Sequence, residues 1–317
     1  MPGASHYRLI WAALALCGLG VLAAAWFEYE IYSRPIVLPQ PRGPHSVGRM
    51  LFDWTDPDRG RKLTVVVWYP ALISNAPIAE YVPRNRGELA AKGPFREIRV
   101  AARNGATMAD GEFPLLVLSP AMARIPTDYT TLAEDLASFG YIVAGVTPPH
   151  SAAVVTEWVA DFHFAVDRVL SEPGLKEHVD QHRIGVLGHS FGGAAAMHAL
   201  ETDERFRRGA NLDGAPQGAP ITHLARPLLI VNGAPLPASQ EALNDRIVAE
   251  FHRICSVDVA GCRIEEVPEA GHMNFSDAGV FPSRFPIPRS HFDLTDIDGT
   301  AFLRKTSGLL RAFFDEM

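Results

Sequence analysis

The sequence predicts an α/β fold in which helices cover both faces of a mostly parallel central sheet. Short apolar runs of strand length alternate with longer segments of helical periodicity from residue 115 onward. Strands that are apolar along their whole length belong to a sheet buried on both faces, which helical crossovers between parallel strands produce. The 317 residues, 47% of them apolar and 21% charged, suit one large domain of this class.

The individual elements follow from periodicity and turn composition. Two strands at 47–54 and 63–69, joined by the turn-forming residues 55–60, predict an opening antiparallel hairpin. Residues 70–111 are predicted to be irregular, with one short helix near 86–92. Further strands are expected at 115–118, 141–146, 184–187, 210–212, 228–231 and 263–267. Further helices are expected at 127–139, 154–170, 240–254 and 302–314.

Residues 9–27 form an uncharged apolar run ahead of this domain. A run of this length can span a bilayer, and Trp11 and Trp26 stand where interfacial aromatic residues are found. The small residues 23–25 equally favour a cleaved signal peptide. Arg8, just before the run, predicts that the rest of the chain crosses the membrane.

The chain is therefore predicted to have three parts. Residues 1–30 are a signal peptide or an N-terminal membrane anchor, residues 31–45 a proline-rich linker, and residues 46–317 one folded domain. The expected location is exported, either periplasmic or extracellular, or anchored to the membrane by residues 9–27.

Charge and cysteine usage bear on three questions: whether the protein binds nucleic acid, whether it has a disulfide, and whether it holds a metal. The formal charge is −7 and no basic run is present, so no nucleic-acid partner is expected. In an exported protein, Cys255 and Cys262 are expected to form a disulfide, with two free buried thiols as the alternative. Neither Cys-x-x-Cys nor His-Glu-x-x-His spacing occurs, so no metal and no cofactor is predicted.

The sequence Gly188-His189-Ser190-Phe191-Gly192-Gly193 lies between an expected strand and an expected helix. Gly-x-Ser-x-Gly in this context is the nucleophile elbow of α/β-hydrolases. The serine occupies a strained turn, so residues two before and two after it must lack side chains. Ser190 is the candidate nucleophile, and His189 is expected to point away from the reacting bond.

A serine nucleophile needs a base to take its proton. His272 follows the last predicted strand, where this fold places the base. His223 precedes a strand and His252 lies inside a helix, which leaves His291 as the fallback.

The base in turn needs a carboxylate to orient it. Asp213 ends the strand at 210–212, whereas no carboxylate follows the strand at 228–231 before Glu241. Asp213 is therefore the candidate acid, with a turn or capping aspartate as the alternative.

An oxyanion hole requires two backbone N–H groups, one from the residue after the serine, Phe191. The other is expected from the loop after 115–118. Pro120 has no N–H, so Ala121 or Met122 must donate, and position favours Met122. His150 ends a strand on the same side and is a candidate pocket residue.

Several segments together resemble the platelet-activating-factor acetylhydrolase group of α/β-hydrolases, including its bacterial relatives. These are the hairpin at 55–61 and 67–71, the strand and loop at 113–120, the elbow at 188–193, the acid segment at 211–214 and the histidine segment at 271–277. The resemblance covers most of residues 47–314.

The resemblance implies a calcium-independent serine esterase that uses Ser190, Asp213 and His272, with Phe191 and Met122 as oxyanion donors. Family members cleave short or oxidised acyl chains from phospholipids. Ala121 and Ala123 stand where the family commonly has glycine, which changes the acyl pocket. Ala121 is thus a candidate substrate contact, as is Phe275 at the start of an apolar segment that extends to residue 288.

The expected function is a serine carboxyl-ester hydrolase that forms an acyl-enzyme on short-acyl or lipid esters. The resemblance implies the 1-alkyl-2-acetylglycerophosphocholine esterase type. A general small-ester or polyester hydrolase is the alternative, and chain-length dependence separates the two. A non-catalytic scaffold with this fold is the third hypothesis, which a complete triad disfavours. The sequence does not predict the oligomeric state.

Overall fold

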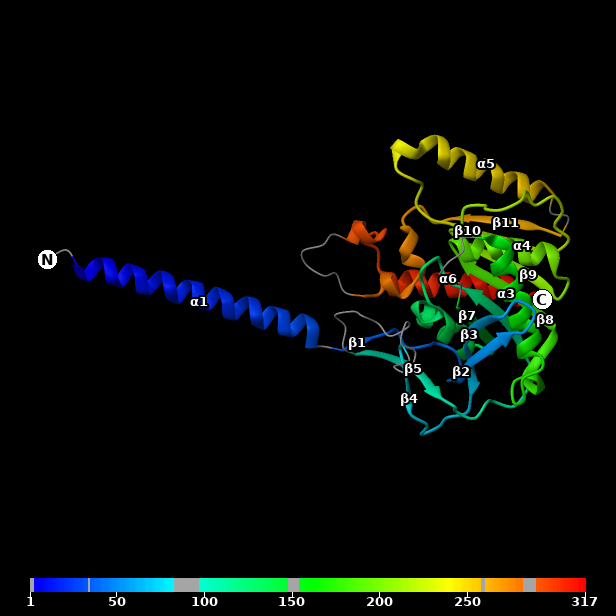
Figure 1. Cartoon of the computed structure of the whole chain (residues 1–317), viewed down its shortest axis with the longest axis horizontal. Coiled ribbons are helices and arrows are strands. Elements are labelled where there is room, and N and C mark those ends of the chain that lie inside the picture. Colours follow the sequence, from blue (N-terminus) through cyan, green and yellow to red (C-terminus); the bar gives the residue numbers. More distant parts are fainter. Residues whose placement is uncertain (1–2, 34, 83–96, 148–153, 258–259, 282–288) are drawn as a thin grey trace.

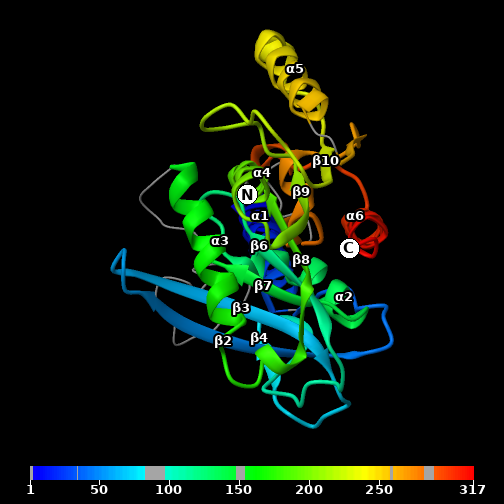
Figure 2. The same cartoon turned by 90° about the vertical axis from the view of Figure 1, so that its right-hand side faces the viewer.

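A computed structural model describes the chain apart from residues 1–2, 34, 83–96, 148–153, 258–259 and 282–288. Among the described residues, eleven strands form one sheet in the order β1-β5-β2-β3-β7-β6-β8-β9-β10-β11, with β4 beside β5. Helices lie on both sides of this sheet, apart from the N-terminal helix, which extends away from it (Figures 1 and 2).

The strands are β1 (Ile36–Val37), β2 (Ser46–Asp56), β3 (Arg61–Ala71), β4 (Ile78–Glu80), β5 (Ile98–Asn104), β6 (Phe113–Ser119), β7 (Ile142–Val146), β8 (Val179–His189), β9 (Phe206–Leu212), β10 (Leu228–Asn232) and β11 (Cys262–Glu266). The α-helices are α1 (Gly3–Ser33), α2 (Thr130–Ser138), α3 (Val155–Val169), α4 (Phe191–Thr202), α5 (Glu241–Val257) and α6 (Gly299–Phe314). Short 3₁₀ turns include η1 (Pro126–Tyr129), η4 (His272–Phe275), η5 (Asp277–Gly279) and η6 (Arg289–Phe292).

The sheet is mixed at one side and parallel across its remainder, since β1 and β2 pair parallel with β5 while β4 pairs antiparallel with it. β2 and β3 form the predicted antiparallel hairpin, and β3 pairs antiparallel with β7. From β7 through β6, β8, β9 and β10 to β11 every pairing is parallel. Buried residues of α3, α4 and α5 share one apolar core, and those of α2 and α6 share the other. These features confirm the predicted α/β class with a mostly parallel, doubly covered sheet.

The structure differs from the prediction in the segment 70–111. Its described part contains β5, which pairs with β1, β2 and β4. The backbone N–H groups of Ala101 and Ala102 in β5 donate to the buried Glu134 carboxylate at 3.1 and 2.7 Å. A side chain from α2 thus completes a strand that pairs with each neighbour over a short stretch, and this tertiary arrangement has no local sequence signal. The helix predicted near 86–92 lies outside the described residues.

The predicted linker at 31–45 also contributes to the domain. Ile36 of β1 is in register with Ile98 of β5. Further along, the Gly43 N–H donates to Ser138 Oγ at 2.8 Å and the His45 N–H donates to the Ser138 carbonyl at 3.0 Å. The second half of this segment therefore lies on the end of α2.

The helix α1 extends away from the sheet and its covering helices (Figure 1). Within the residues that the structure describes, no helix combines enough length with enough hydropathy to cross a membrane. The choice between a membrane anchor and a signal peptide stays a prediction.

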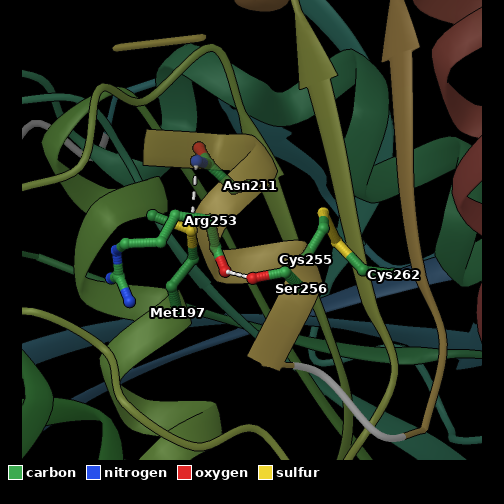
Figure 3. The surroundings of a disulfide bond; sticks show 6 residues. All are labelled: Met197, Asn211, Arg253, Cys255, Ser256 and Cys262. Carbon is green, nitrogen blue, oxygen red and sulfur yellow. Dashed lines mark hydrogen bonds between the residues drawn. A yellow bond between two sulfur atoms is a disulfide. The ribbon is translucent and has the colours of Figure 1, made fainter. Parts of the chain in front are cut away.

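The predicted disulfide between Cys255 and Cys262 is present. It joins the end of α5 to the first residue of β11 (Figure 3). Only Phe251 and Ile254 of α5 are buried, so the helix has a small apolar attachment to the core. The covalent link therefore supplements weak packing at the edge of the sheet.

We expect loss of this disulfide to lower the free energy of unfolding by about 2 kcal/mol, the value for a short closed loop in the chain-entropy account. Thermal unfolding of the wild type with and without reductant measures the loss. The double variant Cys255→Ser/Cys262→Ser is the control, and reductant should not affect it. An unchanged wild-type midpoint under full reduction would contradict a stabilising role for the bond.

Candidate active site

The predicted elbow joins β8 to α4 through Ser190. Ser190 has φ 57° and ψ −126°, a left-handed conformation that non-glycine residues rarely adopt. A Cβ atom added at Gly188 would lie 2.1 Å from the Gly192 carbonyl oxygen, and one at Gly214 would lie 2.1 Å from the Ser190 carbonyl oxygen. The glycines are therefore required by close backbone approach around a strained serine.

Three predicted site residues are hydrogen-bonded in series. Ser190 Oγ lies 2.9 Å from His272 Nε2, and His272 Nδ1 lies 2.6 Å from Asp213 Oδ2. The other carboxylate oxygen of Asp213 accepts the Gly233 N–H at 2.6 Å. Both ends of the Asp213 carboxylate are thus fixed, one by the imidazole and one by the backbone after β10. This geometry allows the serine to lose a proton to an imidazole that a carboxylate orients.

The loop that carries His272 is fixed by a buried amide. Asn274 Oδ1 accepts the N–H groups of Gly271 at 2.9 Å and Thr295 at 3.0 Å. The Met273 N–H donates to the Asp293 carbonyl at 2.9 Å. The fallback base, His291, is exposed on η6 and is not part of the hydrogen-bonded series.

The loop after β6 lies against the first turn of α4. A Cβ atom at Gly192 would be 2.5 Å from the carbonyl oxygens of both Ser119 and Pro120. The Ala121 N–H donates to the Tyr129 hydroxyl at 3.0 Å and is therefore occupied. No hydrogen bond within the described part of the chain engages the N–H of Phe191 or that of Met122. Of the two N–H groups that the sequence left open, the structure leaves that of Met122 available.

The backbone conformation of residue 123, in the same loop, explains why glycine suits this position. Ala123 has φ 59°, and the Arg124 N–H closes the turn on the Ala121 carbonyl at 3.0 Å. A left-handed alanine costs about 1–2 kcal/mol relative to the right-handed region. Glycine, which the family commonly has here, adopts this left-handed conformation without that cost. Ala123 adopts the same conformation, so the turn is retained.

The candidate pocket residues have different outcomes. Ala121 is buried, with 4% of its surface exposed. Phe275 is fully buried between His189 and Phe302, at ring-centroid distances of 5.7 and 5.0 Å. The ring supports the histidine loop from inside the core, and the contact of Phe275 with substrate stays a prediction. His150 and the end of the apolar segment, residues 282–288, lie outside the described residues.

The ring of His189 packs against the ring of His272. The His189 ring is buried, its centroid is 4.6 Å from that of His272, and its Nδ1 lies 2.6 Å from the Tyr129 hydroxyl. Burial lowers the pKa of His189 well below its usual value. The only sequence signal for the contacts of His189 with His272 and Tyr129 is that His189 ends a buried strand next to the nucleophile.

Potential ligand atoms of His189, Asp213 and His272 lie within 4.8 Å of one another, close enough to surround a metal ion. Both ring nitrogens of His272 are, however, engaged with Ser190 and Asp213. The hydrogen-bonded series therefore accounts for this cluster without a metal ligand set.

The histidine segment ends in a buried carboxyl group. Asp277 accepts the N–H groups of Thr130 and Thr131, each at 3.0 Å, and thereby caps the first turn of α2. Burial raises the pKa of Asp277 to about 8. Glu134, on the same helix, is also buried, and burial raises its pKa to about 7.

We expect the stabilising contribution of Asp277 to decline as the pH rises from about 5 to 8, because its native carboxyl group retains a proton that the unfolded chain has released. The folded pKa of Asp277 exceeds its ordinary value, so its stabilising contribution is complete below about pH 4 and lost above about pH 8. Across this range the thermal midpoint of the wild type should fall relative to that of Asp277→Asn. The exposed Asp245→Asn is the matched control, and equal slopes for all three proteins would contradict the assignment.

A strained serine between a parallel strand and a helix, in hydrogen-bonded series with a histidine and an aspartate from later strand ends, defines the α/β-hydrolase class. A solved ferulic acid esterase from Streptomyces cinnamoneus is structurally similar, with a TM-score of 0.75 and 28% identity. That match covers 89% of this chain and 92% of the esterase, and it confirms the fold class.

Within this class, the family model described as platelet-activating factor acetylhydrolase, isoform II, matches residues 33–168 and 163–240. The chain belongs to this family.

Curated relatives are more distant in sequence. Platelet-activating factor acetylhydrolase of Canis lupus familiaris is 23% identical over 265 residues, which cover 62% of this chain. A probable 1-alkyl-2-acetylglycerophosphocholine esterase of Arthroderma benhamiae is 26% identical over 231 residues, which cover 57% of this chain. In both cases the match spans 60% of the relative's length.

Proposed function

We propose that the chain is a serine carboxyl-ester hydrolase. The observation that carries this proposal is the hydrogen-bonded series from Ser190 through His272 to Asp213 at the carboxyl edge of the sheet. Family membership and the structural similarity to an esterase support it. A scaffold without activity would have no need to maintain a strained serine in contact with a base.

The proposed reaction has two halves. Ser190 Oγ attacks the ester carbonyl carbon while its proton passes to His272 Nε2, and Asp213 stabilises the imidazolium that forms. The tetrahedral oxyanion accepts the N–H groups of Phe191 and Met122. Collapse breaks the bond to the alcohol, which takes the proton from His272. Water then attacks the acyl-enzyme through the same base, releases the carboxylic acid and restores Ser190.

For the substrate, we propose short-acyl or lipid esters, and the family supports this class. The ferulic acid esterase supports a second candidate, a general small-ester or polyester hydrolase without lipid preference. The two candidates share the chemistry at Ser190 and differ in the acyl group and alcohol that the site accepts.

Hydrolysis of p-nitrophenyl acetate, butyrate and octanoate, alongside 1-alkyl-2-acetylglycerophosphocholine and methyl ferulate, tests this proposal. A short-acyl lipid esterase should give its highest kcat/KM with the acetylated phospholipid and lose activity from butyrate to octanoate. Highest activity on methyl ferulate would select the small-ester candidate. A folded protein that hydrolyses none of the five would overturn the esterase proposal.

We further propose that the domain acts outside the cytoplasm, either released after cleavage or held by residues 9–27. The Cys255–Cys262 disulfide supports this location because such bonds persist in oxidising compartments. Protease added to spheroplasts of a bacterial host that expresses the full chain should degrade the domain and spare a cytosolic marker. Protection of both proteins would contradict export.

A further inference from the structure

One buried hydroxyl group connects the oxyanion loop to the nucleophile strand. Tyr129 ends η1 with 1% of its surface exposed, and His189 ends β8 with the same exposure. The Tyr129 oxygen lies 3.0 Å from the Ala121 nitrogen and 2.6 Å from His189 Nδ1. Ala121 directly precedes Met122, and His189 directly precedes Ser190.

The Ala121 N–H fixes the direction of one hydrogen bond, and the tautomer of the His189 ring sets the direction of the other. The Ala121 N–H can only donate, so the Tyr129 oxygen accepts it. Burial raises the pKa of Tyr129 far above its usual value, so the hydroxyl keeps its proton. Burial lowers the pKa of His189, so its ring is neutral, and the tautomer with the ring proton on Nε2 accepts the hydrogen bond of the hydroxyl at Nδ1. The result is a directed chain from Ala121 through Tyr129 to His189.

The same short segment also holds the histidine loop. Thr130 and Thr131, which follow Tyr129, donate their N–H groups to Asp277 at 3.0 Å each. The His189 ring, in turn, packs against that of His272. The start of α2 is therefore the point where the oxyanion loop, the nucleophile strand and the histidine loop meet.

We propose that Tyr129 is a positioning residue for the oxyanion hole: its hydroxyl, held by His189, binds the Ala121 N–H and thereby orients the neighbouring Met122 N–H toward Ser190. The proposal rests on the esterase function proposed above. An oxyanion donor acts on charge that develops only in the transition state. Loss of the Tyr129 hydroxyl therefore affects kcat and not the binding of substrate.

The test is Tyr129→Phe in the full chain, assayed with p-nitrophenyl acetate. We expect kcat to fall by about 10- to 100-fold, as for a misplaced oxyanion donor, while KM changes by less than about twofold. Affinity for a trifluoromethyl ketone, which forms a tetrahedral adduct on the serine, should fall by the same factor as kcat. If Tyr129 had a purely structural role, the substitution would lower the unfolding midpoint but would leave kcat, KM and the affinity for the ketone unchanged.

Tyr141→Phe is the matched control. Tyr141 is equally buried and its hydroxyl donates to Asp315, at the opposite end of β7 from the site. This variant should lose stability and keep its kcat. A kcat for Tyr129→Phe equal to that of the wild type, or an equal loss in Tyr141→Phe, would overturn the proposal.

A second pair of variants tests the hydrogen bond between Tyr129 and His189 from the histidine side. The amide oxygen of His189→Asn offers the Tyr129 hydroxyl an acceptor, whereas His189→Leu offers none. We expect the asparagine variant to retain more kcat than the leucine variant by about tenfold. Equal kcat values in the two folded variants would overturn the proposal. A wild type without esterase activity would instead overturn the proposed function itself.

Discussion

Replacing Ser190 with alanine is expected to lower kcat for ester hydrolysis by about 10⁴- to 10⁶-fold, the loss typical of removing the nucleophile of a triad. The hydroxyl is the only group in the series able to form the acyl-enzyme, and His272 then has no proton to accept from it. Steady-state hydrolysis of p-nitrophenyl acetate measures the loss. The unfolding midpoint should stay close to that of the wild type because the strained backbone already accommodates a Cβ atom.

Ser256→Ala is the control for this experiment. Ser256 is exposed on α5, and its hydroxyl donates to the Arg253 carbonyl at 2.6 Å (Figure 3), so it has no part in the series of Ser190, His272 and Asp213. This variant should retain full activity. A Ser190→Ala protein that keeps more than about a tenth of the wild-type kcat would contradict the role of Ser190 as nucleophile.

Replacing Asp213 with asparagine is expected to lower kcat by about 10⁴-fold while the fold is retained, as when a triad carboxylate becomes an amide. Asp213 Oδ1 already accepts the Gly233 N–H, so the amide oxygen of the variant takes that place and the NH₂ group faces His272 Nδ1. A donor in that position selects the tautomer with a proton on Nε2, which cannot accept the serine proton. The rate of ester hydrolysis and the rate of labelling by a fluorophosphonate should both fall.

The matched control is Asp203→Asn. Asp203 follows the far end of α4, where it pairs with Arg205 at 2.6 Å, and it should affect stability without affecting the labelling rate. If Asp213→Asn labels within about tenfold of the wild-type rate, another group orients the histidine and the assignment of the acid is wrong.

The parts of the fold and site that could be predicted are those with a local sequence signal. The parallel strands are continuous apolar runs, and the elbow is a short motif with its own steric demand for glycine at 188 and 192. Strand ends in a parallel sheet meet at one edge, which is why Asp213 and His272 could be chosen from order along the chain alone.

The rest depends on contacts between distant segments. β5 is completed by a glutamate from α2 and by a strand from the predicted linker, and neither partner is visible in its own sequence. Phe275 looks like a pocket residue in an apolar segment, but it turns inward beneath His189. The link from Ala121 through Tyr129 to His189 joins three segments, so the occupied Ala121 N–H, which supports the choice of Met122 as donor, has no signal in the sequence.

The most direct test of the central claim is the mass of the intact protein after reaction with a fluorophosphonate, followed by peptide mapping. The account predicts one adduct per chain, on the peptide that contains Ser190, and none in Ser190→Ala. An adduct on a different residue, or a folded and ester-hydrolysing protein that forms no adduct, would contradict a mechanism through this serine.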